Sequence, residues 1–306
     1  MSSRYQAGII LPGYNALLVP NAPTIGTATG GNASASVTFT APADVGGGAI
    51  TGYSVVSTPS GIIGTGASSP ITVSGLSNGT AYTFKVFATN AYGPSPLSAA
   101  SNSVTPSLAI GDAYQGGFYA GQISTAGNGV ADYNLVVGPA ASAQTSTIQY
   151  KNANTATPGT NSLIDGPQLT ADAVADGNAS VYPAAHFCND LVIGGFSDWY
   201  LPAQNELEVC YYNLKPTTQS NSTGYGINVN AVPARASNYT TSIPAQTSAT
   251  DFRSTGAEDF LLTNRYWTST KIGTTSVRAQ YFTDGYGGEY GKANTFNLRA
   301  IRRVAV

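Results

Sequence analysis

Residues 76–86 read LSNGTAYTFKV, and this stretch determines the fold of the first part of the chain. A leucine and a tight Asn-Gly turn precede a strand in which Tyr82 alternates with Phe84 and Val86. This arrangement is typical of the tyrosine corner of a Greek-key β-sandwich. Around it, short β-rich runs recur at intervals of about ten residues, with turn signals between them, as sandwich strands do. The runs are ASVTFT, ITGYSVVST, PITVSG and the stretch that ends in SNSVTP.

Residues 20–107 are therefore predicted to form an all-β sandwich, and they resemble a fibronectin type III domain. The resemblance includes NAYGPS before the last strand, although no Trp lies in the usual early core strand and Phe39 is expected to replace it. We expect Tyr53, Tyr82 and Phe87 to be core residues. The resemblance implies a spacer and says little about function.

The composition excludes several classes of partner. Only 9% of the 306 residues are charged and the formal net charge is -2, so we do not expect nucleic acid to bind. One His, two Cys and one Met are too few for a transition-metal site, and no cofactor is expected. No apolar run approaches a membrane span or a signal sequence, so we expect synthesis in the cytosol and no membrane insertion.

The chain is not expected to be an enzyme. It has no G-x-S-x-G elbow, P-loop or H-E-x-x-H motif. His186 and Cys188 are i, i+2 on a predicted helix, which places them on different faces, and Glu206 and Glu208 have the same spacing. Carboxylates far apart in the sequence could still meet, as glycoside cleavage requires, so that alternative stays open.

The composition changes after Pro106, and residues 108–306 are predicted to form a second domain. The runs AYQGGFYAGQI and YNLVV, at residues 113–123 and 133–137, are predicted to form an antiparallel pair. Apolar residues at helical spacing predict helices at about residues 181–191 and 203–214, with Cys188 and Cys210 in buried positions. Whether the two thiols touch stays open.

Three separated motifs characterise this second domain: GGFSDWYLP at residues 194–202, YWTST at 266–270 and LRAIRRV at 298–304. In this order they resemble an α+β C-type lectin-like domain of the bacterial and phage branch. More narrowly, they resemble the Lcl C-terminal-like domain of unknown function, which occurs in phage tail fibres and tropism determinants. Trp199, Trp267, Arg299, Arg302 and Arg303 match scaffold motifs, so we expect them to serve core packing and ion pairing.

The resemblance also locates a variable surface between the Trp strand and the last strand, at residues 271–296. Here a predicted strand is followed by TDGYGGEYG, a Gly-rich turn that presents tyrosines, and tyrosine is the side chain that paratopes prefer. The sequence has neither Glu-Pro-Asn nor Gln-Pro-Asp, the triplets that hold calcium in animal lectins of this fold, so binding without calcium is expected. Alternatively, Tyr281 or Phe282 is core and the other tyrosines are ordinary loop residues. The predicted receptor- or glycan-binding residues are Lys271, Arg278, Tyr281, Asp284, Tyr286, Glu289, Tyr290 and Lys292.

Residues 1–19 are apolar and interrupted by Gly and Pro, which suits either a frayed terminus or an attachment arm. Together these features predict a virion appendage of a bacterial virus, a tail fibre or spike. The arm would bind other virion proteins, and the lectin-like tip would bind a glycan or protein receptor on the host cell. Such fibres are commonly trimeric, so a homotrimer is favoured by analogy. The alternative is a structural or decoration protein, of the virion or of a surface layer, that uses the lectin-like domain for subunit contacts.

Overall fold

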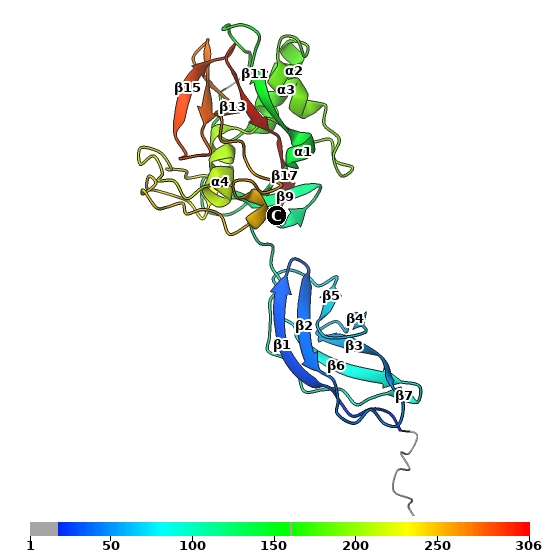
Figure 1. The fold of residues 1–306 in the computed structure, drawn as a ribbon. Coiled ribbons are helices and arrows are strands. Elements are labelled where there is room, and N and C mark those ends of the chain that lie inside the picture. Colours follow the sequence, from blue (N-terminus) through cyan, green and yellow to red (C-terminus); the bar gives the residue numbers. More distant parts are fainter. Residues whose placement is uncertain (1–17, 160) are drawn as a thin grey trace, which may run out of the picture. The chain divides into compact units, whose positions relative to one another are not determined.

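The computed structural model describes residues 18–159 and 161–306. The chain divides into two compact units, Met1–Ala109 and Ile110–Val306 (Figure 1). The predicted attachment arm lies outside the described residues, apart from Leu18 and Val19. The amide of Leu18 donates to the Gly46 carbonyl at 2.9 Å, and Asn90 Nδ2 donates to the Leu18 carbonyl at 2.9 Å, so this end of the predicted arm is bound to the first unit.

The first unit is built from two antiparallel sheets with strand orders β1-β2-β5 and β4-β3-β6-β7. The strands are β1 (Thr24–Gly31), β2 (Ser34–Thr40), β3 (Ile50–Thr58), β4 (Ile63–Gly66), β5 (Ile71–Ser74), β6 (Thr83–Asn90) and β7 (Gly93–Pro94). In β2, β3, β5 and β6 alternate residues are buried, and most of these are apolar. The predicted sandwich is therefore what the first unit forms.

The tyrosine corner lies where the sequence predicts it. Tyr82 is buried, and its hydroxyl accepts a hydrogen bond from the Ser77 amide at 3.1 Å. Phe39 is buried against Tyr53, with ring centroids 4.7 Å apart, so it does take a core position. Phe87 differs from the prediction: it lies on the opposite face of β6 from the buried Phe84 and is only half-buried.

Three serines bind the segment after β7 to β6. The amides of Ser95, Ser98 and Ser101 donate to the carbonyls of Ala88, Val86 and Phe84. The hydroxyls of the same three serines accept from the amides of those same three residues, each at 3.0 Å. The predicted last strand is therefore replaced by a segment that pairs with β6 at every third residue.

The second unit contains two five-stranded sheets with helices packed on them (Figure 1). One sheet has the order β12-β9-β10-β17, with β8 paired to β9, and the other has the order β11-β16-β13-β14-β15. The strands of the first are β8 (Ala113–Tyr114), β9 (Gly117–Ile123), β10 (Tyr133–Val137), β12 (Ala231–Val232) and β17 (Ile301–Ala305). Those of the second are β11 (Gln144–Gln149), β13 (Tyr266–Ile272), β14 (Ser276–Gln280), β15 (Gly287–Gly291) and β16 (Thr295–Arg299). The predicted pairing of β9 with β10 is confirmed, and β17, the last strand, pairs with β10.

The helices are α1 (Ala140–Ala143), α2 (Gly166–Asp176), α3 (Pro183–Asn189) and α4 (Gln204–Leu214), with a 3-10 turn η1 (Thr250–Phe252). The helices predicted near residues 181–191 and 203–214 are confirmed as α3 and α4. Helix α2 was not predicted. Helix α4 packs against strands of both sheets, and most of its residues are buried. In the described part of the chain, no helix is long and apolar enough to cross a membrane.

The two cysteines occupy separate cores. Cys188 packs with Trp199 and Trp267, whereas Cys210 packs with Tyr211 and Phe282. Both thiols are free, and burial raises the pKa of each above the ordinary thiol range. They are core residues, as predicted.

Candidate functional site

Strand β14 lies between β13 and β15 and carries Arg278, one of the predicted binding residues. Cross-strand register pairs Arg278 with Glu289, and Val277 with Tyr290. Because successive side chains point to opposite faces, Arg278 and Glu289 lie on one face of the sheet, and Val277 and Tyr290 lie on the other. The predicted tyrosine-rich surface is thus divided between two faces.

The face with Arg278 carries an aromatic pair. Tyr286 stands edge-on against Tyr225, with centroids 5.1 Å apart and planes at 64°, and Tyr286 is 40% exposed. The Tyr286 amide donates to Asp284 Oδ1 at 3.0 Å, which fixes the turn. Gly285 has a φ of 76°, and a Cβ there would lie 2.4 Å from the Tyr211 ring, so the turn requires glycine. Burial, and then its contact with Tyr286, raises the pKa of Tyr225.

Arg278 and Glu289 form an ion pair beside this aromatic pair. Arg278 Nη2 lies 3.4 Å from Glu289 Oε1, and both side chains are partly exposed. An exposed pair of this kind contributes little to stability, about 0–1 kcal/mol, so both groups are available to a ligand.

A cavity of about 50 Å³ opens between α4, the loop at residues 225–227 and the sheet. We call it the α4–β14 cavity; its lining includes Gln204, Glu208, Tyr225, Thr268, Arg278 and Gln280. Gln204 Oε1 and Arg278 Nε are buried and have no hydrogen-bond partner in the protein. Tyr225 lines this cavity and also forms the aromatic pair with Tyr286.

The other face of the sheet holds Arg265 in an aromatic stack. Its guanidinium lies 4.4 Å from the Tyr281 ring centroid and 4.3 Å from that of Tyr290, and Tyr290 also packs edge-on against Phe296. Tyr281 and Tyr290 are half-buried by these contacts. Both rings pack against Arg265 and are not part of the Tyr225–Tyr286 pair.

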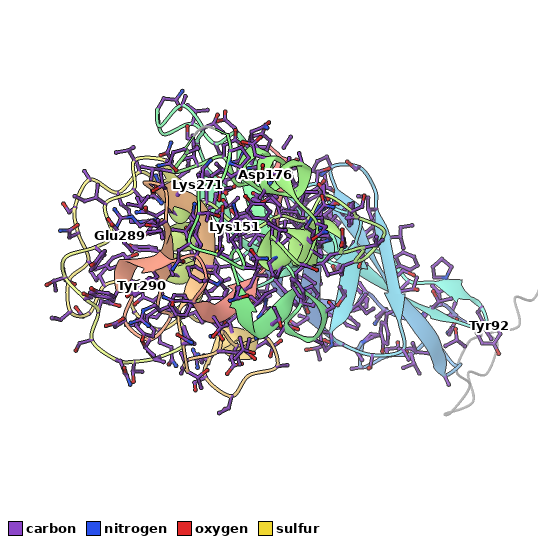
Figure 2. The ribbon with its side chains drawn as sticks, turned by 90° about the horizontal axis from the view of Figure 1, so that it is seen from above. Tyr92, Lys151, Asp176, Lys271, Glu289 and Tyr290 are labelled. Carbon is purple, nitrogen blue, oxygen red and sulfur yellow. The ribbon has the colours of Figure 1, made fainter. Side chains whose placement is uncertain are left out.

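Lys271 and Lys292 do not belong to a binding surface, which corrects the prediction. Lys271 Nζ donates to the carbonyls of Pro158 and Gly159 at 2.5 and 2.8 Å, and Lys292 Nζ donates to the carbonyls of Thr155 and Thr274 at 3.0 and 2.7 Å. Both side chains are buried because the loop at residues 151–159 covers them. Figure 2 shows Lys151 and Lys271 apart from Glu289 and Tyr290. Burial, and then the neighbouring charges of Lys151 and Lys271, lowers the pKa of Lys292 to about 8.

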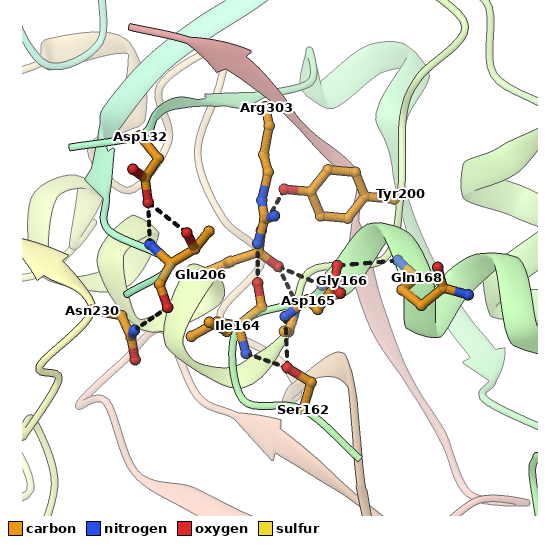
Figure 3. Close-up of polar contacts among 12 residues, drawn as sticks. Asp132, Ser162, Ile164, Asp165, Gly166, Gln168, Tyr200, Glu206, Asn230 and Arg303 are labelled. Atoms are coloured by element: carbon orange, nitrogen blue, oxygen red, sulfur yellow. Dashed lines mark hydrogen bonds and ion pairs between the residues drawn. The ribbon is translucent and has the colours of Figure 1, made fainter. Parts of the chain in front are cut away.

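The N-terminal turn of α4 is held by a buried carboxylate. Glu206 Oε1 accepts from Tyr200 Oη at 2.5 Å and Arg303 Nε at 2.7 Å (Figure 3). Glu206 Oε2 accepts from the amides of Ala203 and Gly166 at 2.8 and 3.2 Å. Burial raises the pKa of Glu206 despite these donors. The network fixes the helix that carries Gln204 and Glu208.

Glu208, two residues further along α4, is also fully engaged. Its Oε1 accepts from Tyr239 Oη at 2.5 Å, and its Oε2 accepts from Asn228 Nδ2 at 2.5 Å and pairs with Arg235. Both oxygens are therefore hydrogen-bonded within the protein, although Glu208 lines the cavity. Glu208 therefore has a structural role, because a general base needs an oxygen that is free to accept a proton from a substrate.

The remaining charged scaffold residues form the expected ion pairs. Arg299 pairs with Glu258 at 2.7 Å, and Arg302 pairs with Asp198 at 2.7 Å. The prediction that Arg299, Arg302 and Arg303 serve packing and ion pairing is confirmed. No group of three or more His, Cys, Asp or Glu side chains able to hold a metal occurs among the residues the structure describes.

Sequence reasoning missed Gln204, Tyr225 and Arg265. One signal was present for Tyr225: the tripeptide Gly-Tyr-Gly occurs at residues 224–226 and again at 285–287, and its two tyrosines form the aromatic pair. Gln204 and Arg265 had no such signal, because their importance depends on neighbours distant in the sequence.

Comparison with known proteins identifies one part of the chain. Residues 21–104 match the family described as fibronectin type III domain, which confirms the resemblance for that part. No curated protein matches the chain.

Similar solved structures include titin kinase with its flanking domains, the twitchin kinase region from C. elegans, and the chicken CNTN1 FN1–FN3 domains. Their sequence identities are 30%, 22% and 16%, over 29%, 29% and 39% of this chain, each with a TM-score of 0.27. The matches cover 17%, 17% and 41% of those chains, so this chain spans less than half of each.

Proposed function

We propose that this protein is a virion appendage of a bacterial virus, a tail fibre or spike, whose second unit binds a receptor on the host surface. The observation that carries the proposal is the exposed Tyr286, braced by Tyr225 beside the Arg278–Glu289 pair. A rigid aromatic group next to groups that donate and accept hydrogen bonds is suited to a glycan or a protein loop. The phage context and the C-type lectin-like fold rest on the three motifs at residues 194–202, 266–270 and 298–304.

The scaffold supports this use of the surface. The buried networks of Glu206 and Glu208 and the glycine turn at Gly285 hold the surface from below, so that binding freezes few side chains. Binding proceeds by stacking and direct hydrogen bonds, without calcium. The fibronectin type III domain acts as a spacer, and residues 1–19 attach the chain to other virion proteins in a homotrimer.

Adsorption of the full-length chain to host cells tests the proposal. Tyr286→Ala should weaken adsorption about tenfold or more, because central aromatic anchors dominate binding energy. Tyr92→Ala is the matched control, since Tyr92 is 44% exposed in the first unit and is expected to leave adsorption unchanged. Equal adsorption of both variants would contradict the proposal.

The alternative function, a structural or decoration protein, predicts another result for the same variants. Tyr286 would then be buried between subunits, and Tyr286→Ala would lower the oligomeric mass measured by light scattering. A lower mass with unchanged adsorption favours the alternative.

A further inference from the structure

The guanidinium of Arg265 differs from the others in the second unit because no oxygen of the described residues pairs with it. Every other arginine that the structure describes forms an ion pair or donates from its guanidinium to a carbonyl. These are Arg235, Arg253, Arg278, Arg299, Arg302 and Arg303. In a chain with so few charged residues, a half-buried cation without a counter-charge is unusual.

Aromatic rings hold this guanidinium in place. Its Cζ lies 4.4 Å from the Tyr281 ring centroid, 4.3 Å from that of Tyr290 and 5.3 Å from that of Phe296. The rings attract the cation through their π faces, but they offer no carbonyl or carboxylate oxygen to its N–H groups. The side chain is therefore positioned in advance while its hydrogen-bond donors stay unused, which lowers the entropy cost of binding a ligand.

The tip of the Arg265 side chain is accessible from outside. Its Nε is buried without a partner, so this nitrogen is not the contact atom. Nη1 and Nη2 also have no partner among the described residues, but they are not among the buried atoms, and the residue as a whole is half-buried. These two nitrogens are the donors that an incoming group meets. Partial burial also leaves the charge less screened than on a fully exposed side chain.

The surroundings favour an anionic ligand group. Glu289, on the adjacent edge strand, lies on the opposite face of the sheet and pairs with Arg278, so it does not neutralise Arg265. The planar guanidinium matches the two oxygens of a carboxylate or a phosphate, which it can bind through two parallel hydrogen bonds. A neutral hydroxyl group would accept only one of these bonds and would leave the charge uncompensated.

We propose that Arg265, held by Tyr281 and Tyr290, is a binding site for an oxyanion, the carboxylate or phosphate group of an acidic ligand. Nη1 and Nη2 donate to the oxygens of this group. The site lies on the face of the sheet opposite Glu289, and it does not depend on the proposed receptor contact at Tyr286.

NMR of the arginine Nε–Hε groups in the full-length chain tests the site. The probes are methyl glucuronide, which carries a carboxylate, glucose 6-phosphate, and the neutral methyl glucoside. The Arg265 signal is identified by its absence from the spectrum of Arg265→Gln. It should shift and saturate with at least one anionic probe and stay in place with the neutral one. The anionic probe that binds more tightly shows whether carboxylate or phosphate is preferred.

Two variants and a control separate binding from folding. Arg265→Gln removes the charge and should weaken binding of the anionic probe, measured from the ligand signals, about tenfold or more. Arg265→Lys keeps a cation between the rings and should preserve the fold, but it loses the paired donors and should weaken binding about fivefold. Lys85→Gln, which removes an exposed cation of the first unit, should bind as wild type does.

Three results would overturn the site. The first is that neither anionic probe shifts the Arg265 signal, and the second is that methyl glucoside shifts it equally. The third is that Arg265→Lys, folded as wild type, binds the anionic probe with unchanged affinity, since the paired donors would then not be used.

Discussion

Replacing Glu206 by Gln should strongly destabilise the second unit. Glu206 is fully buried, and each of its oxygens accepts two hydrogen bonds, one oxygen from Tyr200 and Arg303 and the other from two backbone amides. A glutamine has the same shape but only one acceptor oxygen. Whichever way its amide turns, two donors face an NH2 group, and Arg303 loses its counter-charge.

The expected loss follows from these contacts. Removing one partner of a buried ion pair costs roughly 3–5 kcal/mol, because the other charge is left uncompensated. The control is Glu289→Gln, whose carboxylate is 50% exposed and pairs with Arg278 at 3.4 Å. An exposed pair contributes about 0–1 kcal/mol, so this variant should unfold almost as wild type does.

Urea unfolding followed by tryptophan fluorescence is the appropriate assay. The chain has two tryptophans, Trp199 and Trp267, and both lie in the second unit, so the signal is specific to that unit. The midpoint should fall clearly for Glu206→Gln with an unchanged slope. A loss below about 1 kcal/mol, equal to that of Glu289→Gln, would refute the view that the Glu206 network holds α4.

Two further predictions concern Ser98 and Lys292. Ser98→Ala should destabilise the first unit by about 1–3 kcal/mol in urea unfolding followed by circular dichroism, because the buried Val86 amide loses the hydroxyl that accepts its hydrogen bond. The control is Ser103→Ala, which should cost little because Ser103 is exposed. Equal effects of the two substitutions would refute the serine pairing. Lys292 has a pKa of about 8 in the folded chain and about 10.4 when unfolded, so between these values the unfolded chain holds the extra proton and stability rises with pH. The unfolding free energy of wild type should therefore rise relative to that of Lys292→Met between about pH 8 and about pH 9.5. A difference between the two proteins that does not change with pH would contradict the lowered pKa of Lys292.

Elements whose signals are local could be predicted from the sequence. The turn and alternation around Tyr82 predicted the sandwich, because strand period and turn chemistry are properties of neighbouring residues. Helical spacing placed Cys188 and Cys210 in buried positions for the same reason. The last sandwich strand was predicted less well, since its pairing depends on serine hydroxyls that bond to β6.

Which of the predicted binding residues share a surface depends on long-range packing. The pleat of β14 and β15 separates Arg278 and Glu289 from Tyr290, and Arg265 takes Tyr281 and Tyr290 into a stack. Lys271 looked like an exposed cation because no local pattern shows that the loop at residues 151–159 covers it. Gln204 and Arg278 meet at one cavity although they lie far apart in the chain. Side-chain exposure and convergence depend on long-range packing, which a local sequence pattern does not encode.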